Sequence, residues 1–168
     1  LLGVGSGPRL LTLFSKAPPT EYFPPSPGPT PTDAAVDRWR LATIAQHLAP
    51  GAPVTFYGDE VGLYGGDVVF ARAPMWWDDL LDPVTKSPRY RNEFFALIEW
   101  LNRLRAKYAA LREGISRPVL HDPEHKVLAF ARALPGDEVI VVINYGDAKH
   151  EVQLTAGKAG QLVALMSP

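Results

Sequence analysis

The chain has 168 residues, of which 46% are hydrophobic and 21% charged, and its formal net charge is −1. This composition is typical of a globular protein of one ordinary domain or two small ones, without the clustered basic face of a nucleic-acid-binding protein. The sequence has no cysteine, which excludes disulfides and thiolate chemistry, and no run of the roughly 18 apolar residues that a transmembrane helix needs, so we expect neither a nucleic-acid nor a membrane partner.

The first residues predict a buried strand that ends in a loop, because Leu1 and Leu2 run directly into a glycine-rich stretch. The carboxyl end of such a strand is where many α/β enzymes carry their catalytic residues. The chain begins inside an apolar strand without the features of a signal peptide, and we expect that sequence upstream is missing. Residues 17–31 are rich in proline, which fixes φ and lacks an amide donor, and they predict an extended loop.

A helix is predicted over residues 32–48, with Thr32 as its N-cap and Gly51 just beyond its end. A short apolar strand, Val54 to Tyr57, is predicted next. A helix followed by a short strand is one α/β repeat. The helix carries its apolar stripe at Val36, Trp39, Thr43, Ile44 and Leu48.

Residues 58–87 predict a long loop, and loops of that length inside a compact domain are usually functional. The strongest helix of the sequence follows, with Ser87 as N-cap, Pro88 at the first helical position and Gly114 at its end. Its apolar face consists of Phe94, Leu97, Ile98, Leu101, Leu104, Tyr108 and Leu111. We interpret its charged residues as a solvated face: Arg103, Arg105 and Lys107.

After Gly114 the apolar period changes to two residues, which is typical of strands. The chain is therefore expected to be α/β first and all-β last, with the boundary near Gly114. Strands are predicted at Arg117–Leu120, Val127–Ala133, Glu138–Asn144, Glu151–Leu154 and Gln161–Leu165.

The run GAPVTFYGDEVGLYGG closely resembles the α-amylase superfamily of glycoside hydrolases, family 13, and looks most like its cyclomaltodextrinase, neopullulanase and maltogenic amylase branch. That branch carries a Gly-x-Pro-hydrophobic run and then Tyr-Gly-Asp-Glu at the last barrel strand. RAPMWW, from Arg72 to Trp77, is similar to the family's Arg-x-Pro-Met-x-Trp loop. The matching structural motif is Gly51, Pro53, Tyr57, Gly58, Asp59 and Glu60.

The resemblance covers nearly the whole chain and implies two parts. Residues 1–114 are expected to form the last strands and helices of a (β/α)8 barrel, and residues 115–168 the C-terminal antiparallel β-sandwich known as domain C. Two strands cannot close an eight-stranded barrel. The implied partner is therefore the missing N-terminal barrel segment, upstream or on a second chain.

The opening stretch resembles the end of the seventh barrel strand, where the family typically reads Leu-Leu-Gly-Ser-His-Asp-Thr-x-Arg-Leu-Leu. Gly5 falls on the family's His, and Ser6 falls on its transition-state-stabilising Asp. A retaining glycosidase also needs two carboxyl groups about 5–5.5 Å apart. By resemblance these lie on the fourth and fifth barrel strands, so we expect no catalytic residue on this chain.

Asp59 and Glu60 are adjacent carboxylates, which suggests an acid and a base. We interpret them as structural, because neighbouring strand residues point to opposite faces and do not converge on one bond. The resemblance implies the same, since the family uses this segment to hold the last barrel loop.

Arg72 resembles an arginine that helps to bind sugar in the closest relatives, but its usual acidic companions align with Val68 and Phe70. Substrate contact and a structural hydrogen-bonding role therefore both stay open for Arg72. Trp76 and Trp77 are candidates for stacking on sugar rings, with burial in the core as the alternative.

No cofactor is expected. His121 and His125 lie in the HDPEH run, where Pro123 predicts a turn rather than a helix, and this argues against a zinc site there. The other two histidines, His47 and His150, show no ligand pattern either. Asp78, Asp79 and Asp82 lack EF-hand spacing, so calcium is left open but unsupported.

The resemblance implies a C-terminal part of a protein that hydrolyses or transfers α-glucosidic bonds, inactive on its own and meeting α-glucan through the parent protein. One alternative is a catalytically degenerate pseudoenzyme or an α-glucan-binding or structural module. Another is one half of a split glycoside hydrolase. The sequence leaves the bond preference, the substrate length and the compartment open.

Overall fold

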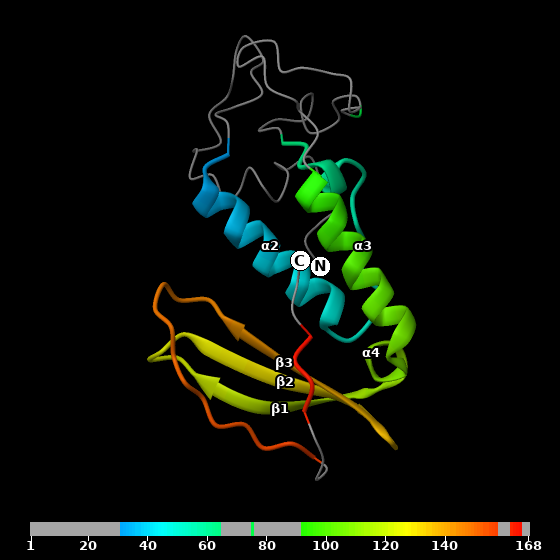
Figure 1. The fold of residues 1–168 in the computed structure, drawn as a ribbon, viewed down its shortest axis with the longest axis vertical. Coiled ribbons are helices and arrows are strands. Elements are labelled where there is room, and N and C mark those ends of the chain that lie inside the picture. The colour runs from blue at the N-terminus through cyan, green and yellow to red at the C-terminus, as the bar shows by residue number, and fades with distance from the viewer. Residues whose placement is uncertain (1–30, 65–74, 76–91, 158–161, 166–168) are drawn as a thin grey trace. The chain divides into compact units, whose positions relative to one another are not determined.

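A computed structural model describes residues 31–64, 75, 92–157 and 162–165 (Figure 1). The chain divides into two compact units. Unit 1 comprises Leu1–Ala42 and Val54–Ile98, and unit 2 comprises Thr43–Pro53 and Glu99–Pro168. The predicted strand end at residues 1–14, the proline-rich loop, most of the 58–87 loop and the Ser87 cap lie outside the described residues.

Helix α2, Asp33–Leu48, confirms the first predicted helix and its N-cap. The side-chain oxygen of Thr32 accepts a hydrogen bond from the Ala35 amide at 3.3 Å, and its carbonyl accepts one from the Val36 amide at 3.0 Å. The first bond satisfies an amide of the first turn that has no partner within the helix, and the second is the first backbone bond of the helix. Beyond the helix, Gly51 takes φ 100°, a left-handed conformation that glycine adopts without steric cost.

The described core of unit 1 is an aromatic pair with aliphatic neighbours. The rings of Trp39 on α2 and Phe94 on α3 stack with centroids 4.1 Å apart and an interplanar angle of 22°. Trp39 is 1% exposed and Phe94 fully buried. Stacking adds specific geometry to a large buried apolar area, so this pair is a main source of stability in the unit. The other buried apolar residues are Ala35, Val36, Val61, Leu63, Leu97 and Ile98.

The second predicted helix is two helices. Helix α3, Asn92–Lys107, is followed by Tyr108 in an extended conformation (φ −102°, ψ 110°) and by α4, Ala109–Glu113. The prediction of one continuous helix as far as Gly114 is therefore wrong at Tyr108. Arg112 compensates for the break, because its guanidinium donates to the carbonyls of Ala106, at 2.7 Å, and Arg105 near the end of α3.

Unit 2 contains a three-stranded antiparallel sheet in the order β1-β2-β3, which α4 contacts (Figure 1). Strands β1 (Ile115–Asp122), β2 (Val127–Leu134) and β3 (Asp137–Asn144) confirm three of the five predicted strands. Residues 151–157 and 162–165 contain no strand, so the prediction of strands at Glu151–Leu154 and Gln161–Leu165 is wrong for the part that is described. Within those ranges the sheet has no fourth strand.

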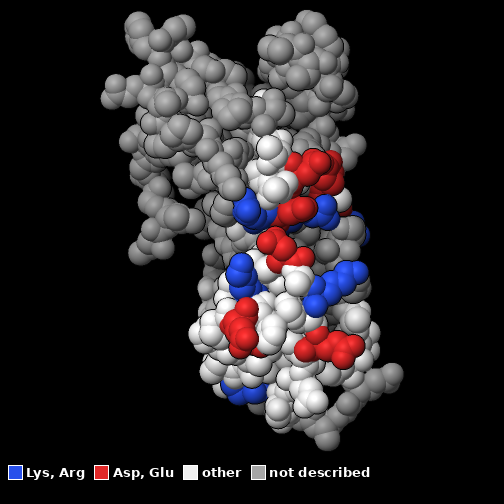
Figure 2. Space-filling model, turned by 90° about the vertical axis from the view of Figure 1, so that its left-hand side faces the viewer, with Lys and Arg blue, Asp and Glu red and all other residues white. Residues whose placement is uncertain are grey.

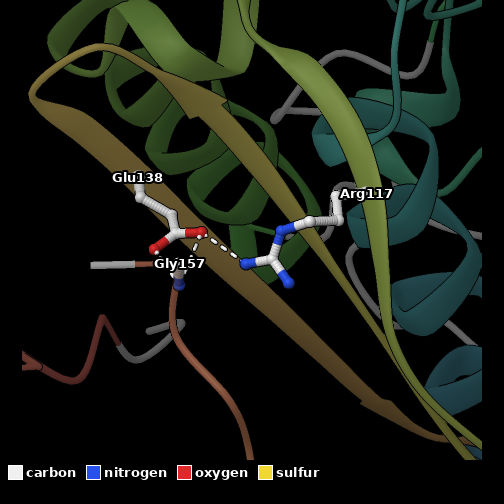
Figure 3. Close-up of polar contacts among 3 residues, drawn as sticks. All are labelled: Arg117, Glu138 and Gly157. Carbon is white, nitrogen blue, oxygen red and sulfur yellow. Dashed lines mark hydrogen bonds and ion pairs between the residues drawn. The ribbon is translucent and has the colours of Figure 1, made fainter. Parts of the chain in front are cut away.

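A side-chain latch, rather than a strand ladder, fastens the chain after β3 to the sheet (Figure 3). The amide of Gly157 donates to both carboxylate oxygens of Glu138, at 2.9 and 3.3 Å, and Arg117 donates to one of them at 2.7 Å. A Cβ atom at Gly157 would lie 2.9 Å from that carboxylate, so only glycine fits without a shift. These bonds engage one backbone amide of the segment, whereas a strand ladder would pair its amides and carbonyls in succession.

The helices in the described part of the chain are too short or too polar to span a bilayer. On the face that Figure 2 shows, acidic and basic side chains of the described residues are interspersed, and neither sign forms a large patch.

Candidate functional site

The predicted site residues fall into two groups. Gly5 and Ser6, at the positions of the family's His and Asp, and Arg72, Trp76 and Trp77 lie outside the described residues, and their roles stay predictions. The structural motif from Gly51 to Glu60 is described, and it can be built from its backbone upward.

The motif ends in a tight turn between Gly58 and Leu63. Residues Asp59–Val61 form a 3-10 helix, with Gly58 at φ 88° and Gly62 at φ 74° on either side. The Gly58 carbonyl accepts hydrogen bonds from the amides of Val61, at 3.1 Å, and Leu63, at 2.8 Å. Both flanking residues need left-handed φ, which costs any other L-residue roughly 1–2 kcal/mol. The sequence GDEVGL therefore makes a rigid turn that buries Val61 and Leu63.

The two carboxylates of the turn project in different directions. Asp59 and Glu60 are consecutive in a 3-10 helix, where successive side chains are about 120° apart, rather than on opposite faces of a strand. The reason for their divergence changes, but the structural interpretation of the pair is unaffected. One oxygen of Glu60, Oε2, is buried and has no hydrogen-bond partner among the described residues.

The segment before the turn is not the predicted strand. Residues 54–57 have no strand assignment, and the side chains of Val54, Phe56 and Tyr57 are 74%, 50% and 41% exposed. A buried parallel strand needs neighbours to complete its hydrogen bonds. None of the three described strands, β1 to β3, pairs with this segment.

Two arginines that the sequence analysis did not single out for this role hold the carbonyl end of α2. Arg105 donates to the carbonyls of His47 at 2.6 Å and Gly51 at 2.7 Å, and is therefore more than part of a solvated face. Arg132, 1% exposed, donates to the Gly114 carbonyl at 2.8 Å and more distantly to that of Leu48 at 3.4 Å. Cations at the carboxyl end of a helix are stabilising because the end carries partial negative charge.

Arg132 is a buried charge without an ion-pair partner among the described residues. Burial, and the nearby charge of Arg105, lower the pKa of its guanidinium. Its Nε has no hydrogen-bond partner in the described structure. The sequence signal was the arginine in the apolar strand VLAFARAL, but its partners lie far along the chain and could not be read from that strand.

His47 is 1% exposed, and its Nδ1 lies 2.8 Å from the Thr43 carbonyl. Burial lowers the pKa of its imidazole, the bond to Thr43 opposes that shift, and the charge of Arg105 adds to it. The neutral form is therefore favoured in the folded protein. Because a neutral ring must donate to the carbonyl, Nδ1 carries the proton.

This depressed pKa predicts a loss of stability on acidification. The unfolded chain binds the proton near pH 6.5 and the folded protein only at lower pH, so the stability that the neutral ring provides is complete above about pH 6.5 and declines below it. The free energy of unfolding, measured with urea at pH 7.5 and 5.5, should fall less between these two pH values in His47→Leu than in the unsubstituted chain. Equal pH dependence in both would contradict the assignment, and contributions from the other histidines cancel in the comparison.

No group of three or more His, Asp or Glu side chains among the described residues could hold a metal ion. The described residues thus present a rigid turn, an exposed apolar segment and a helix end held by arginines. They do not present a convergent set of catalytic groups.

No family model matches the chain. It is 30% identical to a cyclomaltodextrinase of Bacillus sp over 128 residues, which cover 76% of this chain and 22% of that protein. It is 30% identical to neopullulanase 2 of Thermoactinomyces vulgaris over 123 residues, which cover 73% of this chain and 20% of that protein. The chain thus spans about a fifth of the length of these curated relatives.

Solved structures are similar over a comparable share. A cyclomaltodextrinase structure matches 92% of this chain and 22% of its own, with a TM-score of 0.68 and 28% identity. The crystal structure of a maltogenic amylase from S. marinus matches 68% of this chain and 15% of its own, with a TM-score of 0.57 and 27% identity.

Proposed function

We propose that this chain is a C-terminal part of an α-glucan-acting protein of the α-amylase family, glycoside hydrolase family 13. The chain is a homologue of cyclomaltodextrinases, neopullulanases and maltogenic amylases of that family, over about a fifth of their length. The observation that carries the proposal is the match to the cyclomaltodextrinase structure, which extends over 92% of this chain.

The proposed organisation has a barrel end at residues 1–114 and domain C at residues 115–168. Helices α2 and α3 precede the antiparallel sheet β1-β2-β3 in the chain, as a barrel end followed by domain C requires. The exposed Val54 and Phe56 support this assignment, because in a closed barrel the same segment would be covered by neighbouring strands. The missing N-terminal barrel segment, upstream or on a second chain, is therefore the proposed partner.

In the parent protein the chain would support the active site and supply no catalytic group to it. By the family resemblance the nucleophile and the acid/base lie outside this sequence, and Ser6 stands where a carboxylate is needed. A hydroxyl carries no negative charge to stabilise an oxocarbenium-like centre. Arg72, Trp76 and Trp77 are the proposed contacts to α-glucan, through donated hydrogen bonds and ring stacking.

We expect the isolated chain to release no reducing sugar from cyclodextrin, pullulan or starch above the buffer background. The reason is that hydrolysis with retention needs two carboxyl groups on either side of one bond, and Asp59 and Glu60 diverge. A reducing-sugar assay with a purified active cyclomaltodextrinase as positive control measures this. Turnover that co-purifies with the chain and disappears in Ser6→Ala would contradict the proposal.

A degenerate parent that binds glucan without cleaving it is the second candidate, favoured by Gly5 and Ser6 at the family's His and Asp positions. A parent protein with both upstream carboxylates would make the two candidates separable. In that protein, the combined change Gly5→His and Ser6→Asp should raise kcat, because transition-state electrostatics of this kind contribute several kcal/mol. Absence of a gain in a folded parent would count against a weakened enzyme and favour the binding module.

A further inference from the structure

Two turns meet beside the sheet of unit 2 and bring two histidines together. The turn between β1 and β2 carries His125, and the chain after β3 carries His150. Their rings have centroids 4.6 Å apart and an interplanar angle of 57°. Backbone contacts hold the turns in place, since the Tyr145 amide donates to the Lys126 carbonyl at 2.9 Å. The histidine pair is therefore a product of the fold and not of neighbouring sequence positions.

Asp122 holds the first of these imidazoles. Its Oδ1 accepts from the His125 backbone amide at 3.0 Å, and its Oδ2 lies 2.8 Å from His125 Nδ1. In the neutral ring Nδ1 must donate to the carboxylate, which leaves the lone pair on Nε2. A carboxylate that orients a histidine in this way is typical of metal-ligating histidines.

We propose that His125 and His150 form a two-imidazole site for a divalent transition-metal ion such as Zn²⁺ or Ni²⁺, with water completing the coordination. Metal–nitrogen distances of about 2.0–2.1 Å and a tetrahedral angle place the two ligating nitrogens roughly 3.3 Å apart. The ring centroids are 4.6 Å apart, so the two imidazoles are near enough for one ion to be shared between them. Imidazole ligands suit these ions and not the oxygen-seeking Ca²⁺ or Mg²⁺.

The site differs from the zinc arrangement that the sequence analysis considered and rejected. That arrangement paired His121 with His125 on one helix face, and the structure has a strand and a turn there instead. His121 and Asp122 are consecutive in β1, opposite Leu128 and Val127 of β2, so the His121 side chain lies on the face of the sheet opposite to that of Asp122. His121 is therefore a matched control for the pair.

Metal binding at this site would tie the β1–β2 turn to the start of the segment that the Glu138 latch holds at its other end. The segment from His150 to Gly157 would then be fixed at both ends, first through the metal and last through the Gly157 amide. The expected consequence is a higher melting temperature with metal than without, because binding to the folded state alone stabilises it.

The test is isothermal titration calorimetry of the untagged chain with NiCl₂ and, separately, ZnCl₂ at pH 7.5. We expect one ion per chain. His125→Asn and His150→Asn should each abolish the equimolar step, and Asp122→Asn, which keeps the oxygen that accepts the His125 amide, should weaken binding by about 10–100-fold. His121→Asn should bind the metal ion as tightly as the unsubstituted chain does.

Nuclear magnetic resonance of the histidine rings provides a second, independent measurement, in which the same variants assign the resonances. The ring C–H resonances of His125 and His150 should broaden with substoichiometric Ni²⁺, while those of His47 and His121 should not. Circular dichroism confirms that each variant is folded before titration. Absence of an equimolar step in the unsubstituted chain, or a step that survives both His125→Asn and His150→Asn, would overturn the proposal. An equal loss in His121→Asn would place the ion elsewhere and would also overturn it.

Discussion

Phe94→Ala is expected to lower the free energy of unfolding by about 3–5 kcal/mol, the range for removing a large aromatic side chain from a packed core. Phe94 is fully buried and stacks on Trp39 at 4.1 Å, so the substitution removes apolar burial and a ring contact and leaves a cavity. The measurement is urea unfolding followed by the tryptophan fluorescence of the chain, which is sensitive to the environment of Trp39.

Phe95→Ala is the matched control, because it changes the same residue type at the next position of α3. Phe95 is 47% exposed, so its loss should cost less than half as much as that of Phe94. The difference between the two variants reports burial rather than helix propensity, since both replace phenylalanine by alanine in one helix. Equal losses would show that the described packing of α2 against the Phe94 side of α3 is wrong.

Gly114→Ala is expected to cost about 3 kcal/mol, at the upper end of what overpacking usually costs. A Cβ at this position would lie 2.9 Å from the Ala133 carbonyl oxygen and closer still to that of Ala110, and both are backbone atoms that cannot rotate away. The φ of Gly114 is −68°, which alanine adopts readily. The expected loss is therefore steric, and it should appear in urea unfolding as a lower midpoint with an unchanged m-value.

Two controls separate this steric effect from others. Glu113→Ala changes an exposed neighbour and should stay within about 0.5 kcal/mol of the parent. Gly136→Ala places a Cβ in open space but at φ 88°, so it should cost only the roughly 1–2 kcal/mol of the left-handed conformation. If Gly114→Ala were as stable as Glu113→Ala, the close approach of α4 to β2 at Ala133 would be contradicted.

Arg105 and Arg132 both donate hydrogen bonds to carbonyls at the end of α2. Arg132 donates to the carbonyl of Gly114, the residue at which α4 ends and β1 follows, and Arg105 donates to two carbonyls at the end of α2. Helix dipoles and unpaired carbonyls account for their stabilising effect without any carboxylate. These arginines are structural, and the proposed function does not assign them a contact with substrate.

Local signals in the sequence determined much of this protein. The cap at Thr32 predicted α2, and the two-residue period after Gly114 predicted five strands, of which three form, because such signals act between residues a few positions apart. The motif from Gly51 to Glu60 and the RAPMWW run likewise indicated the family, which the comparisons with cyclomaltodextrinases support.

Tertiary structure alone decided the rest. The break at Tyr108, the missing strand assignment of residues 54–57 among the described residues and the irregular path to Gly157 depend on which carbonyls, strands and carboxylates are within reach. Arg105 and Arg132 reach partners 58 and 84 positions away, at His47 and Leu48. His125 meets His150 only because two turns pack together. Periodicity reports which face of a segment is apolar, but only packing determines which distant group meets that face.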